Sequence, residues 1–271
     1  MRRPSWFWAH DTSSASVLCG PPLGGWTAGG PRAEIAWRAR RLRAFMGEVM
    51  AKISVNKLGE YMVARSPARR RRIILDQHQP ATFITSRYSA ARKAIADFLI
   101  DQDHPKLAAA AVQLRDERGG TDHAHETRQL CADAINSFID MAPALAIDGV
   151  TYSAAPQRPH KLVMAEVEVS VAPDVMLVGT VRRRNLGGAL KLYFAKGNDK
   201  LLLEDGSRYV ATAIHEWLAG HPHGGHAPHA AYCLSVDVFR GRVTAAPTAR
   251  IRRLDDLRAA CEEIAAGWPQ Q

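Results

Sequence analysis

The chain has 271 residues, of which 46% are hydrophobic, and its 36 Lys and Arg against 27 Asp and Glu give a formal net charge of +9. This hydrophobic share excludes disorder of the whole chain, and the length allows one large domain or two small ones. The excess of positive charge favours polyanionic partners, among which nucleic acid is the first to consider.

The cysteine pattern and the apolar runs indicate where the protein resides. Four cysteines are widely spaced without a CxxC pair, so neither a disulfide framework nor a zinc ribbon is indicated. The apolar runs are far shorter than the roughly 20 residues that cross a bilayer, and no signal-peptide pattern opens the chain. We therefore expect a cytoplasmic protein without a membrane partner, and its protein partners are not indicated.

Residues 1–49 differ in composition from the rest of the chain. Clustered Gly, Pro, Trp and Ser, as in GPPLGGWTAGG, give no helical or strand period until about Ala33. A well-patterned segment, MAKISVNKLGEYMV, begins at Met50. Two interpretations stay open, a translation start at Met50 and a disordered basic extension over 1–49. In both, residues 50–271 are predicted to form a single domain.

The part from 50 to 142 is predicted to be mainly helical. Ser54 or Asn56 offers a cap to a short helix that ends near Ser66, and Pro67 suits the first turn of the next helix. Three further segments carry apolar residues at helical spacing, namely 86–100, 107–114 and 126–141.

After Pro143 the pattern changes to strands. Alternating apolar and polar residues over 163–171 predict a first strand, and PDVMLVGTV from Pro173 predicts a second. The basic turn RRRNLGG, in which Gly187 and Gly188 suit a tight connection, leads into a third strand, GALKLYFAK. The remaining elements are a helix, two strands and a terminal helix over 207–218, 232–239, 243–247 and 254–268.

The order helix, three strands, helix, strand resembles the core of the PD-(D/E)XK nuclease superfamily, in particular its RecB-like and Cas4-like branch. The family often opens with a pattern like S-x-S-x-L-x-x-Y-x-x-C-P, to which ISVNKLGEYMVARSPARRR from Ile53 is similar. SRYVATAIHEWL from Ser207 is similar to a family helix that carries Q-x-x-x-Y, although it lacks the glutamine. The resemblance implies an α+β fold, with a helical N-terminal half followed by an αβββαβ restriction-endonuclease-like core.

The resemblance also implies a metal-dependent active site. Asp174 matches the aspartate that opens the second strand and binds the metal, which would be Mg²⁺ or Mn²⁺. A lysine of the third strand, Lys191 or Lys196, would position the attacking water, while the metal would stabilise charge on the phosphate. Ser66 stands where the family motif has cysteine, so no iron–sulfur cluster is expected.

One carboxylate of the family's pattern is missing. The family has Asp or Glu two residues before its lysine, whereas Ala189 precedes Lys191 and Phe194 precedes Lys196. A replacement is expected from the predicted first strand, where alternation puts Glu168 and Glu166 on one face. The alternative is that Asp174 only caps a turn and the lysines are solvated strand residues.

Two arginine groups are candidate contacts to nucleic-acid phosphates, with a solvated surface as the alternative. One begins a helix and the other follows the second strand: Arg69, Arg70, Arg71 and Arg72, and Arg182, Arg183 and Arg184. The histidine-rich segment after His215 does not fit HExxH, because no histidine stands at position 219, so a zinc protease is rejected.

Three functional hypotheses follow. The first is a nucleic-acid-processing protein of bacterial type, a Mg²⁺-dependent phosphodiesterase of the PD-(D/E)XK kind. The second is a catalytically inactive relative that binds nucleic acid or protein. The third is a basic accessory protein unrelated to nucleases, in which the helical half carries the function.

Overall fold

The computed structural model describes residues 50–80, 87–145, 149–197 and 202–269. The chain divides into Met1–Gly47 and a compact unit, Glu48–Gln271, and the predictions for residues 1–49 lie outside the described residues. The compact unit is a mixed α+β structure, as predicted. Its α-helices in the described part are α2 (Val55–Val63), α3 (Pro67–His78), α5 (Ser89–Asp101), α6 (His104–Asp116), α7 (Asp122–Met141), α8 (Leu203–Gly220) and α9 (Ile251–Ala266).

The helical half follows the sequence prediction. The Ser54 hydroxyl accepts a hydrogen bond from the Lys57 amide and caps α2, and the Ser66 hydroxyl caps α3 with Pro67 in its first turn. The apolar face of α5 is buried, as its spacing predicts. Among the described helices, none is long and apolar enough to cross a membrane.

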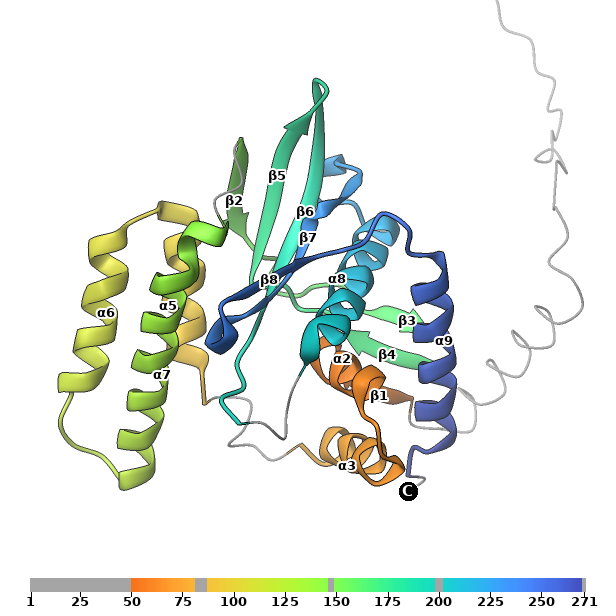
Figure 1. Ribbon diagram of the computed structural model, residues 1–271, viewed down its shortest axis with the longest axis horizontal. Coiled ribbons are helices and arrows are strands. Elements are labelled where there is room, and N and C mark those ends of the chain that lie inside the picture. The colour runs from red at the N-terminus through yellow and green to blue at the C-terminus, as the bar shows by residue number, and fades with distance from the viewer. Residues whose placement is uncertain (1–49, 81–86, 146–148, 198–201, 270–271) are drawn as a thin grey trace, which may run out of the picture. The chain divides into compact units, whose positions relative to one another are not determined.

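A five-stranded sheet forms the centre of the compact unit (Figure 1). The first three strands that the chain supplies to this sheet are antiparallel neighbours, α8 follows them, and the next strand pairs in parallel with the third. From α7 onwards the chain supplies a helix, three strands of this sheet, a helix and a strand, but two strands of a second sheet are inserted after the first strand, so the predicted order is found only in part. The strands lie in the order β2 (Val150–Ala154), β5 (Val175–Val181), β6 (Arg184–Tyr193), β7 (Pro228–Asp237) and β8 (Arg242–Ala245).

The segment 163–171 was expected to be the first strand of this sheet, and that prediction is wrong. It forms a hairpin of β3 (Leu162–Met164) and β4 (Val167–Ser170), in a separate sheet where β4 pairs in parallel with β1 (Ala51–Ser54). The chain reverses at Ala165 and Glu166, whose φ angles of 43° and 65° are those of a tight two-residue turn. The reversal breaks the alternation, so Met164 and Val167 are both buried.

Apolar cores fill both faces of the five-stranded sheet. Along β5 and β6, Leu177 and Leu190 pack against α5, α6 and α7, while Met176 and Ala189 face the other way. That second face is covered by α2 and α8, together with the small sheet and α9 (Figure 1). Each central strand thus contributes side chains to two helical layers.

Two glycines, Gly179 on β5 and Gly188 on β6, allow Tyr232 of β7 to lie close to these two strands. A Cβ on Gly188 would lie 2.2 Å from the Tyr232 carbonyl oxygen, and one on Gly179 would lie 2.7 Å from the Tyr232 ring. The prediction that Gly187 and Gly188 make the turn between β5 and β6 is wrong, because both lie within β6.

Candidate functional site

Asp174 lies immediately before β5 and is bound to the backbone of β6. Its amide donates to the Leu190 carbonyl at 2.8 Å, and its Oδ2 accepts a hydrogen bond of 2.6 Å from the Leu192 amide. The side chain is only 5% exposed. The carboxylate is therefore held at a fixed position on the sheet rather than at the end of a mobile turn.

Lys191 is the predicted lysine that the structure brings to Asp174. Alternation along β6 puts it on the face that carries Ala189 and Tyr193. Its Nζ lies 3.5 Å from Asp174 Oδ2 and donates to the Ala172 carbonyl. Burial lowers the pKa of Lys191, and the Asp174 carboxylate acts in the opposite direction.

Arg92 is a third member of the site and was not among the residues predicted from the sequence. Its Nη1 lies 2.6 Å from Asp174 Oδ1, and its guanidinium lies 5.1 Å from the centre of the Phe194 ring, which stacks on Tyr88. Arg92 comes from α5, which is 82 positions away from Asp174 in the chain. No local pattern marks it, because only the packing of α5 against the sheet brings the two together.

The other predicted catalytic residues lie elsewhere. Lys196 Nζ lies 2.8 Å from an oxygen of Asp133 on α7, without a contact to Asp174 in the described structure. Glu168 belongs to the small sheet, where its carboxylate is 3.8 Å from Lys161 Nζ, and Glu166 occupies the β3–β4 turn. Glu168 and Glu166 do not share a strand face, because the turn separates them.

The residues around Asp174 do not fit a divalent cation. Mg²⁺ and Mn²⁺ prefer several oxygen ligands, whereas this site offers one carboxylate that already has Arg92, Lys191 and the Leu192 amide as partners. Ala189 supplies no second carboxylate. Within the described ranges, no group of three or more His, Cys, Asp or Glu is arranged to hold a metal.

The opening motif from Ile53 packs beside this site. The Asn56 amide on α2 donates to the Leu192 carbonyl at 3.1 Å, and its Oδ1 is buried without a partner in the described part of the chain. One turn further along α2, buried Glu60 accepts from the Tyr193 hydroxyl at 3.2 Å. Burial and this carboxylate raise the pKa of Tyr193. The motif therefore contributes polar contacts to β6 next to Lys191.

The arginines of α3 are largely neutralised by acidic partners. Arg69 pairs with buried Glu60 at 2.8 Å, Arg70 with Glu263 at 3.1 Å, and Arg72 with Asp76 at 2.9 Å. Arg71 is exposed. Most of the positive charge that the sequence assigns to this cluster is thus used within the protein.

The second arginine group, unlike the arginines of α3, has no acidic partners among the described residues. Arg182, Arg183 and Arg184 are exposed at the tip of the β5–β6 hairpin. Across the described ranges, none of the three forms an ion pair with an acidic side chain. No acidic side chain in the described part of the chain therefore offsets the charge of this group.

The histidines of the segment after His215 do not converge on one point. His221 stacks on His160 with ring centroids 4.1 Å apart, and His229 contacts Tyr232. His215 is buried on α8, where burial and the nearby Arg250 lower its pKa to about 4.

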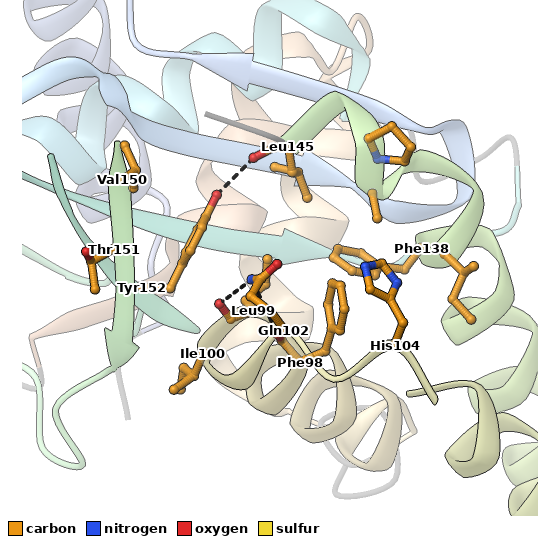
Figure 2. Close-up of a pocket in the computed structure, with 13 residues that line it drawn as sticks. Phe98, Leu99, Ile100, Gln102, His104, Phe138, Leu145, Val150, Thr151 and Tyr152 are labelled. Carbon is orange, nitrogen blue, oxygen red and sulfur yellow. Dashed lines mark hydrogen bonds between the residues drawn. The ribbon is translucent and has the colours of Figure 1, made fainter. Parts of the chain in front are cut away.

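An apolar pocket of about 600 Å³ lies on the opposite face of the sheet, between α5, α7 and β2 (Figure 2). Phe98 and Phe138 form its aromatic wall with the edge of His104. The Tyr152 hydroxyl donates to the Leu145 carbonyl at 3.0 Å, as Figure 2 shows. The titratable side chains of its described lining are His104, which packs on Phe98, and Tyr152, whose hydroxyl is bonded to the backbone, and the lining lacks the carboxylate and lysine of the Asp174 cluster.

No protein-family model and no curated protein matches the chain. The class that the structure defines is a mixed α+β protein with a cluster of buried Asp174, buried Lys191 and half-exposed Arg92 at the open end of the β5–β6 hairpin and three arginines at its tip. Its function is therefore inferred from the geometry of these two features.

Proposed function

We propose that this chain is a nuclease-like protein of the PD-(D/E)XK type that binds nucleic acid without cleaving it. The observation that carries the proposal is the neutralised carboxylate of Asp174. One oxygen accepts from Arg92, and the other accepts from the Leu192 amide and lies near Lys191.

The order and pairing of the elements support the restriction-endonuclease-like core. Helix α7 precedes the antiparallel strands β2, β5 and β6, with the β3–β4 hairpin inserted after β2, and α8 leads to β7, which is parallel to β6. Asp174 stands before the middle strand, and Lys191 on the third strand lies 3.5 Å from it. These are the positions that the family pattern assigns to its aspartate and lysine.

The charge balance argues for binding without cleavage. Two cationic side chains surround one carboxylate, and Ala189 occupies the position of the second acid. A divalent cation would have to displace Arg92 and accept repulsion from Lys191. Two unit charges 4 Å apart interact by about 4 kcal/mol near a protein surface. Arg92 thus takes the electrostatic role that a metal has in an active relative.

A nucleic-acid partner is supported by the net charge of +9 and by the unpaired arginines of the β5–β6 hairpin. Phosphate backbones bind such charge with release of counterions, without any need for a catalytic metal. The alternative partner, a protein, has no comparable support in the described surface.

Incubation of the full chain with labelled single- and double-stranded DNA and RNA, with Mg²⁺ or Mn²⁺, tests the proposal. We expect binding and intact strands. Metal-dependent cleavage that disappears in Asp174→Asn would overturn it in favour of a phosphodiesterase, the candidate that the Asp174–Lys191 contact favours. Cleavage that persists in Asp174→Asn would point to another site or to a contaminating nuclease, and absence of binding to all four ligands would refute the proposal.

A further inference from the structure

The tip of the β5–β6 hairpin stands free of the rest of the sheet. The last residue of β5 that pairs with β2 is Gly179, and β7 pairs with β6 only from Gly187 onwards. Residues 180–186 therefore form a two-stranded ribbon without a third strand, which extends beyond the neighbouring strands in Figure 1. We call this segment the arginine ribbon.

The turn of the arginine ribbon carries residues that its backbone does not favour. Arg182 and Arg183 have φ angles of 50° and 64°, a region in which Asn and Gly are the preferred residues of two-residue hairpins. Arginine in this conformation costs stability. Residues that do not suit the backbone conformation of their turn are typical of functional sites.

The side chains of the arginine ribbon are hydrogen-bond donors, which favours an anionic partner. Arg182, Arg183 and Arg184 are exposed and form no ion pair within the described part of the protein. The Thr180 hydroxyl donates to Asn185 Oδ1 at 2.8 Å, which ties the two strands together and leaves the Asn185 amide hydrogens as further donors.

The shape and composition of the ribbon favour a double helix over a single strand. Bases of single-stranded nucleic acid stack on aromatic side chains, and residues 180–186 include none. Two paired strands are about 4.8 Å apart and fit the major groove of B-form DNA, which is about 12 Å wide. The major groove of double-stranded RNA is too narrow for side chains to enter.

We propose that the arginine ribbon enters the major groove of duplex DNA and that Arg182, Arg183 and Arg184 contact the phosphates at its edges. This inference rests on the proposed function, since it names the nucleic acid that the protein binds. It also assigns the binding to a surface separate from the Asp174 cluster.

Fluorescence anisotropy with a labelled DNA duplex at several salt concentrations tests this inference. The full chain is compared with Arg182→Ala/Arg183→Ala/Arg184→Ala. The matched control, Arg118→Ala/Arg158→Ala/Arg252→Ala, removes the same charge from scattered exposed positions. We expect the ribbon variant to bind at least about tenfold more weakly and the slope of log affinity against log salt to fall by about 2.7, or roughly 0.9 for each lost phosphate contact. The control should keep the wild-type slope.

A second variant separates folding from binding. Arg182→Asn/Arg183→Gly places favoured residues at the two positive-φ positions, so we expect a higher melting temperature together with weaker DNA binding. Weaker binding in a protein that is more stable cannot come from misfolding.

The outcomes distinguish the two proposals. If the wild type binds duplex DNA and the ribbon variant binds equally well, the arginine ribbon is not the contact surface, although the proposed function stands. Tighter binding of wild type to single strands or to duplex RNA would overturn the major-groove assignment. If the wild type binds none of these ligands, the proposed function itself fails.

Discussion

Asp174 joins the two strands of one hairpin to a helix that is 82 positions away in the sequence. Its carboxylate connects the start of β5 with Lys191 on β6 and Arg92 on α5. A buried ion pair of this kind contributes little net stability, because desolvation offsets the attraction, but removal of one partner leaves an uncompensated charge. Removal of Asp174 alone should therefore lower the free energy of unfolding more than replacement of the whole ion pair by apolar residues.

Asp174→Ala should lower the free energy of unfolding by about 3 kcal/mol, since it leaves buried Lys191 without its counter-charge. Addition of Lys191→Met should recover part of this loss. Asp133→Ala is the control, because its exposed pairs with Lys196 and Arg115 are worth about 1 kcal/mol or less. Urea denaturation measures all four proteins. Equal losses in Asp174→Ala and Asp133→Ala would contradict the buried cluster.

His215 should make the fold sensitive to acid. Its pKa of about 4 in the folded protein lies below the value of 6.5 expected in the unfolded chain. The unfolded chain therefore binds the proton first, and stability is lost as the pH falls from about 6.5 towards 4. The loss is on the order of 3 kcal/mol when complete. It is absent above the unfolded pKa, where both states are neutral.

His215→Gln should flatten the dependence of unfolding free energy on pH between 6.5 and 4. Exposed His223→Gln is the control and should keep the wild-type dependence. Urea denaturation at a series of pH values gives the comparison. A curve for His215→Gln that coincides with the wild type would show that the imidazole is not held neutral.

At the scale of elements, the approach of β7 to the β5–β6 hairpin depends on two glycines in different ways. The neighbour of Gly179 is the Tyr232 ring, whereas the neighbour of Gly188 is the Tyr232 backbone. A side chain can be truncated, but the Tyr232 backbone cannot move without disturbing the next residue, Cys233, which pairs with Ala189.

Gly179→Ala and Gly188→Ala should each cost about 3 kcal/mol of unfolding free energy, by overpacking. Tyr232→Ala should offset the cost of Gly179→Ala in the double variant, because it removes the ring that the new methyl meets. It should leave the cost of Gly188→Ala intact. Gly197→Ala, with no atom within 4 Å of the added Cβ, is the control. If Tyr232→Ala restored the free energy of unfolding equally in both glycine variants, the distinction between a ring contact and a backbone contact would be wrong.

The sequence predicts the elements better than their pairing. Helical spacing and the caps at Ser54 and Ser66 sufficed to find α2 and α3, since these signals are local. The turn at Ala165–Glu166 was missed because neither residue is a usual turn former, so the first strand was assigned to the wrong sheet. At the site, the resemblance supplied Asp174 and two lysines, and only tertiary packing selects Lys191 and adds Arg92.

At the scale of the whole molecule, the two cores share their central strands. Leu177 and Leu190 belong to the core beside α7, while their neighbours Met176 and Ala189 belong to the core beside α8. Loss of packing on one face therefore loosens strands that the other face needs. We expect the compact unit to unfold in one cooperative step.

Phe138→Ala should lower the free energy of unfolding by about 4 kcal/mol, since Phe138 is fully buried beside α5. Hydrogen exchange of the slowest amides should accelerate equally in α7 and in β4 on the other face. Exposed Val112→Ala is the control. Faster exchange confined to α5, α6 and α7 would mean that the two layers unfold separately.

The parallel pairing of β1 with β4 has a consequence for biosynthesis. Ile53 pairs with Val169, so a ribosome that adds 5–20 residues per second needs on the order of ten seconds between the two. Among the described strands β4 is the partner of β1, and throughout that interval it has not yet been made. The N-terminal helices can form early, but the sheet that anchors them closes only once the middle of the chain has emerged. Chaperone contacts during synthesis should therefore concentrate on the first strand until its distant partner arrives.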